Sequence, residues 1–235
     1  MRINKYLASA GFGSRRKCED LVREGRVNCN GQVIDNLGFS VDEKKDKITV
    51  DGNEVTLAKE FTYVMLHKPK GVITSMSDER GRKTVVDIMP EEYKKLKPVG
   101  RLDYDSEGLL LMTDDGELSY VLTHPFHEIK KTYVVKVEGD VKESQLAVIR
   151  AGVVIDGIRL SKCKVKILEK VKEDTKLEVV ISEGKNRQVR KMFDAVGLNV
   201  IFLKRTQIGE LRLGGLTRGA CRPLNIQEVL YLKSL

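Results

Sequence analysis

The sequence predicts an α+β protein: a domain built on a mixed, largely antiparallel sheet, preceded by a small domain of two helices and a β-hairpin. Segments with the alternation typical of strands outnumber segments with helical periodicity. The two kinds of segment do not alternate regularly, as they do in doubly wound parallel sheets. A chain of 235 residues is long enough for a small domain and a medium one.

The N-terminal part reads as two short helices followed by strands. Residues 3–9 carry apolar side chains at helical spacing, and two glycines then end that helix. Ser14 is expected to cap a second helix over residues 15–24. A β-hairpin is expected to turn at Asn30-Gly31, and residues 47–50 form a further strand.

The chain is expected to divide near residue 58, because residues 53–61 lack periodicity and read as a linker. This gives one domain over residues 1–58 and a second over residues 59–235. In the second domain, strands are expected near residues 62–66, 109–113, 132–137, 165–168, 177–182, 200–204, 211–213 and 222–224. Helices are expected after Asp115-Gly116, over residues 141–151, after Gly184 and from Gln227.

The composition excludes several classes of protein. The hydrophobic fraction of 41% is enough for a packed core, yet no apolar run approaches the ~20 residues of a membrane span. The N-terminus lacks an apolar secretion signal, so we expect a soluble, cytoplasmic protein. Four cysteines without a C-x-x-C pair, and three histidines, argue against a zinc site or a disulfide framework. No apolar seam stands out for self-association, so a monomer is expected.

Positive charge is concentrated near the two ends of the chain, which has a formal net charge of +8. Residues 1–30 carry seven basic and three acidic side chains, and residues 181–222 carry nine basic and three acidic ones. The second cluster includes a helix with an apolar face and a basic remainder, which suits phosphate or carboxylate recognition. Two such clusters favour a polyanionic partner, nucleic acid, bound at two places.

A charged loop between two glycines precedes an apolar strand. Residues 100–108 read Gly-Arg-Leu-Asp-Tyr-Asp-Ser-Glu-Gly, and an apolar run over residues 109–112 follows at once. A polar loop held at the edge of a rigid sheet is where catalytic groups are well placed. The leucine and tyrosine inside the loop predict that part of it packs inward. The alternative is a solvated, charged hairpin before a core strand.

The N-terminal domain resembles the small RNA-binding domain named after ribosomal protein S-four. The resemblance rests on Ser14-Arg15-Arg16-Lys17 and on Arg26-Val27-Asn28-Cys29-Asn30-Gly31. In that family a basic helix face and a hairpin grip structured RNA through its shape and its phosphates. The resemblance implies RNA-binding roles for Arg2, Arg15, Arg16, Lys17 and Arg26.

The second domain is similar to bacterial rRNA pseudouridine synthases of the RsuA/RluB type. Residues 100–116 carry the signature, and Lys68-Pro-Lys-Gly71, Lys131-Thr-Tyr133 and residues 183–193 match in order. A C-terminal pattern over residues 208–224 also fits, so the match spans almost the whole chain. Five motifs in the right order are far more specific than any one of them.

The resemblance implies that the protein isomerises a uridine of ribosomal RNA to pseudouridine, with no metal and no organic cofactor. An aspartate, Asp103, acts on the ribosyl unit as nucleophile or base; the glycosidic bond breaks, and the base is rejoined through a ring carbon. Tyr133 stacks on the target base, and Arg190 pairs with Asp103. The implied substrate-binding residues are Arg101, Leu102, Ile181, Lys68, Asn186 and Arg187.

These residue types suit the chemistry. A carboxylate in a dry pocket avoids hydrolysis, and a neighbouring guanidinium keeps it charged. An aromatic face holds a flipped base with a stacking energy of order 1–3 kcal/mol. Taken singly, Tyr133 reads as an ordinary strand aromatic, Arg190 as a solvated helix residue and Asp105 as a turn acid. His124 and His127, in a His-Pro-Phe-His segment, are expected on a loop near the RNA or the core.

Two other classes of protein fit parts of the sequence. Asp103-x-Asp105 resembles the nucleophile loop of magnesium-dependent phosphatases of the haloacid-dehalogenase type, but residues 97–101 do not read as the apolar strand that precedes it there. A non-catalytic rRNA-binding or ribosome-assembly factor would share the basic clusters, but it needs no acid in that loop. Among synthases, the loop favours a uridine in large-subunit rRNA, free or in an assembly intermediate, over one in small-subunit rRNA.

Overall fold

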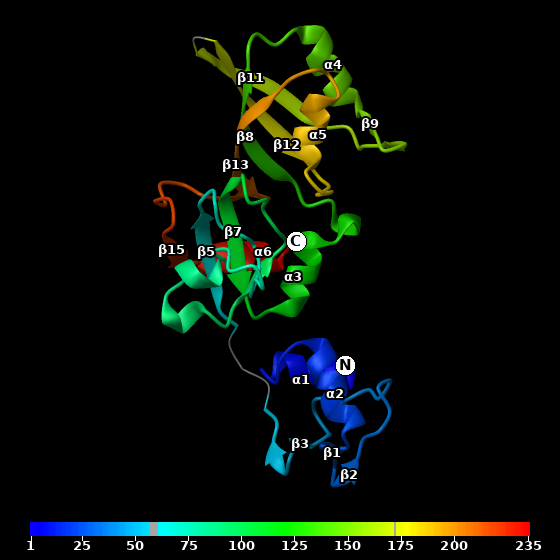
Figure 1. Cartoon of the computed structure of the whole chain (residues 1–235). Coiled ribbons are helices and arrows are strands. Elements are labelled where there is room, and N and C mark those ends of the chain that lie inside the picture. The colour runs from blue at the N-terminus through cyan, green and yellow to red at the C-terminus, as the bar shows by residue number, and fades with distance from the viewer. Residues whose placement is uncertain (57–60, 172) are drawn as a thin grey trace. The chain divides into compact units, whose positions relative to one another are not determined.

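The computed structural model describes residues 1–56, 61–171 and 173–235 (Figure 1). The chain forms two compact units, Met1–Phe61 and Thr62–Leu235, and each has hydrophobic core clusters of its own. The boundary expected near residue 58 lies outside the described residues. No described helix combines the length and the apolar character that crossing a bilayer requires.

The N-terminal unit combines two helices with a small antiparallel sheet. Its helices are α1 (Ile3–Ser9) and α2 (Arg15–Arg23), and the Ser14 hydroxyl caps α2 by accepting a hydrogen bond from the Lys17 amide at 3.2 Å. The strands, in the order β2-β1-β3-β4, are β1 (Val27–Cys29), β2 (Gln32–Val33), β3 (Ile48–Val50) and β4 (Asn53–Glu54). Residues 53–54, expected in a linker, therefore form an edge strand instead.

The conformation of the turn between β1 and β2 explains why these two strands form a hairpin. Asn30 and Gly31 have φ angles of 51° and 85°, and positive φ at both central residues is typical of the type I′ turn that matches strand twist. Behind the hairpin, Ile3, Leu7 and Cys18 from the helices are fully buried with Val27 of β1. Burial of this shared apolar face is what holds so small a unit together.

The second unit is built on a mixed sheet with the strand order β11-β12-β8-β13-β7-β5-β15, to which β14 and β6 attach at β13 and β7. Within the described residues, β13 and β7 form its one parallel pair. The α+β class and the mixed, largely antiparallel sheet are therefore confirmed. The strands are β5 (Tyr63–Lys68), β6 (Lys97–Val99), β7 (Glu107–Thr113), β8 (Lys131–Glu138), β11 (Lys164–Val171), β12 (Asp174–Ile181), β13 (Val200–Ile208), β14 (Leu211–Arg212) and β15 (Cys221–Pro223).

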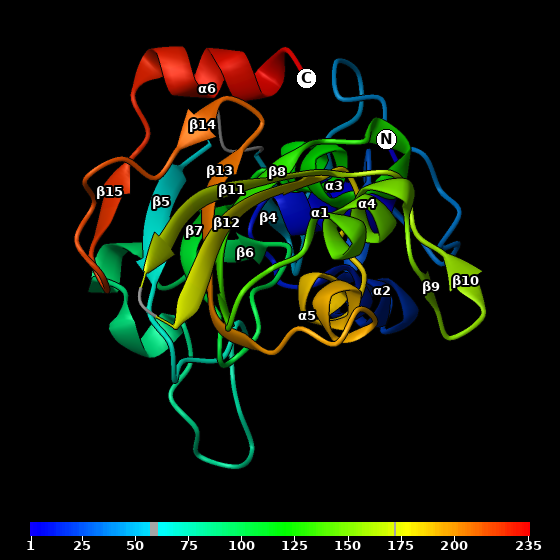
Figure 2. The same cartoon turned by 90° about the horizontal axis from the view of Figure 1, so that it is seen from above.

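Helices cover different parts of this sheet. Figure 1 shows α4 (Glu143–Ala151) and α5 (Gln188–Asp194) beside the β8–β12 part, whereas α3 (Gly116–Thr123) and α6 (Ile226–Lys233) lie beside β5 and β7; Figure 2 shows α6 from above. Alternate residues of β5 enter different cores: Val64 joins the cluster that contains Phe193 of α5, and Met65 joins the cluster that contains Leu232 of α6. Because both its faces are covered, β7 is buried along its whole length.

The remaining elements are short. They comprise the hairpin β9 (Val154–Ile155) and β10 (Ile158–Arg159) and the 3₁₀ turns η1 (Val86–Ile88), η2 (Glu91–Tyr93) and η3 (Pro125–His127). A short strand, β6, does precede the Asp103 loop and pairs with β7, but only Val99 of its three residues is buried, so it is not the apolar strand of the phosphatases. Pro98 has no N–H to donate, and it is tolerated because β6 lies on an edge of the sheet.

Gly108 sets the contact between β7 and β13. Its φ is +119°, and a Cβ on it would lie 2.1 Å from the carbonyl oxygen of Arg205. Only glycine allows the two parallel strands to approach this closely. Since β7 begins where the charged loop ends, this contact also fixes the loop against β13.

Candidate active site

The loop between β6 and β7 is held by its backbone carbonyl groups. The Thr74 hydroxyl donates to the Leu102 carbonyl at 2.8 Å and accepts from the Leu102 amide at 3.2 Å. The Gly71 amide donates to the Tyr104 carbonyl at 2.8 Å, and the Ser106 amide donates to the Asp103 carbonyl at 3.1 Å. With its backbone fixed in this way, the loop projects the Asp103 side chain from a rigid base.

The Lys68 side chain holds the same loop through three hydrogen bonds to backbone carbonyl groups. Its ammonium donates to the carbonyl oxygens of Asp103 and Ser106, both at 2.9 Å, and of Pro69 at 3.1 Å. Burial lowers its pKa to about 8, and the neighbouring charge of Asp103 opposes that shift. The Lys68 side chain, expected to bind substrate, is completely buried and does not line the pocket described below; its ammonium holds the Asp103 loop.

A pocket of about 250 Å³ lies over this loop. Most of the residues expected at the site line it: Arg101, Leu102, Asp103, Tyr133, Ile181, Asn186 and Arg187. They come from the loop, from β8, from the end of β12 and from the segment before α5, so four separate parts of the chain meet here. Arg101 is exposed, whereas Leu102 and Ile181 are buried apolar walls.

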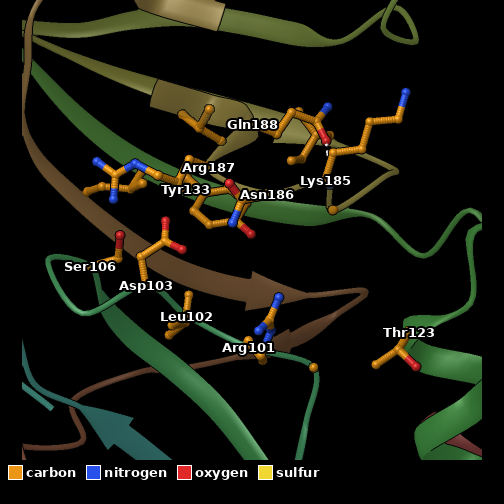
Figure 3. A pocket seen from close by; sticks show the side chains of 15 residues that line it. Arg101, Leu102, Asp103, Ser106, Thr123, Tyr133, Lys185, Asn186, Arg187 and Gln188 are labelled. Carbon is orange, nitrogen blue, oxygen red and sulfur yellow. Dashed lines mark hydrogen bonds between the residues drawn. The ribbon is translucent and has the colours of Figure 1, made fainter. Parts of the chain in front are cut away.

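Asp103 and Tyr133 face one another in this pocket. Figure 3 shows the half-buried Asp103 carboxylate pointing toward the Tyr133 ring, with Arg187 beside them. Tyr133 is 8% exposed, and its backbone pairs with Val179 on one side and Arg205 on the other, so the middle of the sheet holds the ring in place. The structure thus brings together the acid and the aromatic ring that the sequence indicated.

Arg190 was expected to pair with Asp103, but it pairs with Asp105 instead. Its Nε lies 3.2 Å from Oδ2 of Asp105, and its other nitrogens donate to the carbonyl groups of Asp105 at 3.0 Å and Val200 at 2.9 Å. The turn that Lys68 fixes directs Asp105, two residues beyond Asp103, toward α5. Arg190 does not line the pocket, so it can act only through the loop.

Asp105 also binds Arg187, through two hydrogen bonds of 3.1 Å. Although burial raises the pKa of Asp105, hydrogen bonding to Arg187 and the charges of Arg190 and Arg187 lower it below the ordinary value. The hydrogen bonds to Asp105, and then the charges of Asp105 and Asp103, raise the pKa of Arg187. The interpretation of Asp105 as a turn acid did not include these two ion pairs. Arg187 and Arg190 lie three residues apart, and this spacing could have indicated that both contact one carboxylate.

Ser106 is a further pocket residue that the sequence did not reveal. It is 1% exposed, and its hydroxyl has no hydrogen-bond partner within the described part of the chain. Buried hydroxyl groups are nearly always bonded, so an unpartnered one among the residues that line the pocket is unusual. Over the same described residues, no group of three or more histidine, cysteine, aspartate or glutamate side chains could hold a metal ion.

The basic residues implied in RNA binding lie on the N-terminal unit and are all exposed. Arg15, Arg16 and Lys17 form the first turn of α2, and in the described structure none of them is engaged in an ion pair. Arg2 precedes α1. Arg26 differs, because its guanidinium bonds to Asp51 at 2.5 and 2.9 Å and to Glu24 at 3.0 Å. Its charge is therefore already balanced by two carboxylates.

Comparisons with known proteins agree with this architecture. A family model described as RNA pseudouridylate synthase matches residues 62–195, and one described as S4 domain matches residues 1–48. The chain is 43% identical to ribosomal large subunit pseudouridine synthase B of Bacillus subtilis, over 100% of this chain and 96% of the relative. It is 39% identical to an uncharacterized RNA pseudouridine synthase of Mycobacterium tuberculosis, over 97% of this chain and 91% of that protein.

A solved structure also matches the whole chain. The crystal structure of a pseudouridylate synthase superposes with a TM-score of 0.72 at 32% identity, covering 99% of both chains. Sequence and fold therefore lead to the same family. This protein belongs to the RNA pseudouridylate synthases and carries an S4 domain at its N-terminus.

Proposed function

We propose that the protein isomerises one uridine of large-subunit ribosomal RNA to pseudouridine, without a metal or an organic cofactor. The observation that carries this proposal is the Asp103 carboxylate, held on an immobilised loop and directed at the Tyr133 ring in a pocket of about 250 Å³. That volume is slightly below the ~300–1,000 Å³ of pockets for drug-sized ligands, which suits one flipped nucleotide. The name of the Bacillus subtilis relative supports the choice of the large subunit.

Asp103 acts on the ribosyl unit of the flipped nucleotide, as nucleophile or base. The bond between C1′ and N1 breaks, the detached uracil turns, and a bond forms between C1′ and C5. C5 then loses its proton and N1 gains one, so substrate and product are isomers. The apolar walls Leu102 and Ile181 exclude water, which would otherwise convert the cleaved intermediate into a hydrolysis product.

Tyr133 holds the base while it is detached. Stacking on an aromatic ring is worth ~1–3 kcal/mol per base and does not depend on which edge of the base is presented. The base can therefore rotate against the ring without leaving the pocket. Tyr133 is also the polar side chain placed to help remove the final proton.

The segment before α5 supplies the polar side of the site. Arg187 lines the pocket together with Asp103 and offers a fixed positive charge to the bound nucleotide, and Asn186 offers an amide to the edge of the uracil. Arg101, exposed at the pocket, is available to a phosphate of the bound strand. Arg190 is proposed as a positioning residue, through Asp105, and the Ser106 hydroxyl as a further contact to the nucleotide.

The N-terminal unit is proposed to deliver the RNA. Positive charge for its phosphates comes from Arg2, Arg15, Arg16 and Lys17. Arg26 could bind a phosphate only after its guanidinium breaks its ion pair with a carboxylate such as that of Asp51. The RNA partner is ribosomal RNA, free or in a subunit assembly intermediate. We further propose that the protein acts in the cytoplasm as a monomer.

Two experiments test the proposal. Pseudouridine mapped in ribosomal RNA from cells with and without the gene should differ at one position of the large-subunit RNA; a difference in the small-subunit RNA would transfer the activity there, and no difference would contradict it. In vitro, Asp103→Asn should abolish tritium release from uracil-labelled RNA yet leave the Kd for RNA within about threefold, because the exchange keeps size and removes only the reactive charge. A fully active Asp103→Asn enzyme would remove the catalytic assignment.

A further inference from the structure

Four aromatic rings, one on α3 and three in the segment between α3 and β8, gather outside both core clusters of the second unit. The Tyr120 and His124 rings are stacked, with centroids 4.7 Å apart. His127 meets the Tyr120 and Phe126 rings edge-on at 6.0 and 5.6 Å. Phe126 is 83% exposed and Tyr120 is 56% exposed. We call these residues, Tyr120, His124, Phe126 and His127, the aromatic patch.

The backbone holds the aromatic patch in one arrangement. Pro125 ends α3 by forcing His124 into an extended conformation, with φ of −73° and ψ of 132°. One 3₁₀ turn follows, in which Nδ1 of His124 accepts a hydrogen bond from the Phe126 amide at 3.3 Å. Glu128 then adopts a left-handed conformation and leads to Ile129, which is buried in the core. A fixed turn that presents a phenylalanine to solvent is not explained by core packing.

The aromatic patch borders the catalytic pocket. Thr123, the last residue of α3, lines that pocket, and a Cβ on Gly100 of the Asp103 loop would lie 3.4 Å from its methyl group. In Figure 3, Thr123 lies at the lower right, and Arg101 lies between it and Asp103. Beyond the patch, the chain enters β8, which carries Tyr133. The aromatic patch therefore includes the residue that directly follows Thr123, which lines the pocket that receives the target uridine.

We propose that the aromatic patch is a stacking site for an unpaired base next to the target uridine. A strand whose uridine is flipped into the pocket exposes neighbouring bases, and each base has a π-face that an exposed aromatic ring can cover. Arg101 and Lys185, which line the pocket, and Lys130, which is exposed just before β8, offer positive charge to the phosphates between those bases. This inference rests on the proposed function, and the occupant is single-stranded RNA.

The test uses the full-length enzyme and an unmodified transcript of large-subunit rRNA. Phe126→Ala should raise KM about tenfold and leave kcat unchanged, because stacking is worth ~1–3 kcal/mol and 1.4 kcal/mol is a factor of ten. Phe126→Trp should keep the wild-type KM, whereas Phe126→Leu should behave like alanine, since a leucine offers apolar area without a π-face. Ile226→Ala, which removes another exposed apolar side chain, is the matched control and should change neither constant.

Three outcomes would overturn the inference while the enzyme remains active. They are an unchanged KM for Phe126→Ala, a wild-type KM for Phe126→Leu, or an equal rise in KM for Ile226→Ala. The leucine result would point to an apolar protein contact in place of base stacking. If the wild-type enzyme released no tritium from the free transcript, the Kd values of the same variants for the transcript would decide the stacking site alone, and equal Kd values would overturn it.

Discussion

Asp105 joins the loop of Asp103 to the helix that completes the pocket. It accepts two hydrogen bonds from Arg187 and lies within 3.2 Å of Arg190, whose own side chain is only 10% exposed. Arg187 is thus held by one carboxylate while it lines the pocket beside another. A charged group restrained in this way keeps its orientation when the substrate enters, which is the usual condition for electrostatic catalysis.

The acid dependence of stability should reveal this bridge. Because the pKa of Asp105 is lower in the folded protein than the ordinary value of 3.8, folding favours its ionised form. The stabilisation is therefore present above the ordinary pKa and is lost as the pH falls through the lowered one. Asp105→Asn should reduce the free energy of unfolding at pH 7, and its difference from wild type should shrink below about pH 4.

Urea unfolding of both proteins over a series of pH values checks this expectation. Glu79→Gln, which removes an exposed carboxylate of the same unit, is the control and should leave the free energy of unfolding nearly unchanged at every pH. A loss for Asp105→Asn that is as large at pH 3 as at pH 7 would mean that its effect does not arise from the charged form.

At the scale of elements, β7 connects the Asp103 loop to the core. Its side chains alternate between two hydrophobic clusters: Leu110 and Met112 belong to one, and Leu109 and Leu111 to the other. A strand buried on both faces cannot slide by one residue without exchanging the two sets. The position of the loop at its start is therefore fixed by packing on both sides of the sheet.

Gly108 should be intolerant of a side chain. Gly108→Ala places a methyl group 2.1 Å from the Arg205 carbonyl at a φ of +119°, so β7 and β13 have to separate. We expect a loss of the order of 3 kcal/mol or more in the free energy of unfolding. Gly215→Ala is the control, since its Cβ would meet no atom within 4 Å. Equal denaturation midpoints in urea for the two variants would contradict this account of the parallel pair.

On the scale of the whole molecule, the two units are proposed to have different roles, RNA binding for the first and catalysis for the second. Family membership excludes the phosphatase hypothesis for the second unit, and the S4 domain accounts for the basic N-terminal cluster. In the proposed function, charge on α2 supplies affinity that does not depend on RNA sequence, whereas the pocket selects one nucleotide. Substitutions in the two units should therefore affect different measured constants.

Replacing Arg15, Arg16 and Lys17 with glutamine should weaken RNA binding and spare catalysis. The slope of log K against log salt is negative, and each lost phosphate contact should reduce its magnitude by about 0.7–0.9. The total reduction is roughly 2–3 if all three side chains bind phosphates. The kcat at saturating RNA should equal that of wild type. A variant with Lys44→Gln and Lys45→Gln, exposed in the same unit, controls for the loss of charge; an equal change in its salt slope would argue against a specific role for α2.

The sequence by itself determined the α+β class, the hairpin at Asn30-Gly31, the cap at Ser14 and the family, because these depend on local periodicity, on turn chemistry and on motif order. The tertiary structure alone decided the partners of the charged side chains. It turned Lys68 inward, paired Arg190 with Asp105 instead of Asp103, and placed Thr123, the neighbour of the aromatic patch in the chain, in the wall of the pocket. The partner of a charge is set by residues 35 to 85 positions away in the chain, and no local pattern specifies which of several nearby acids or carbonyl groups it will meet.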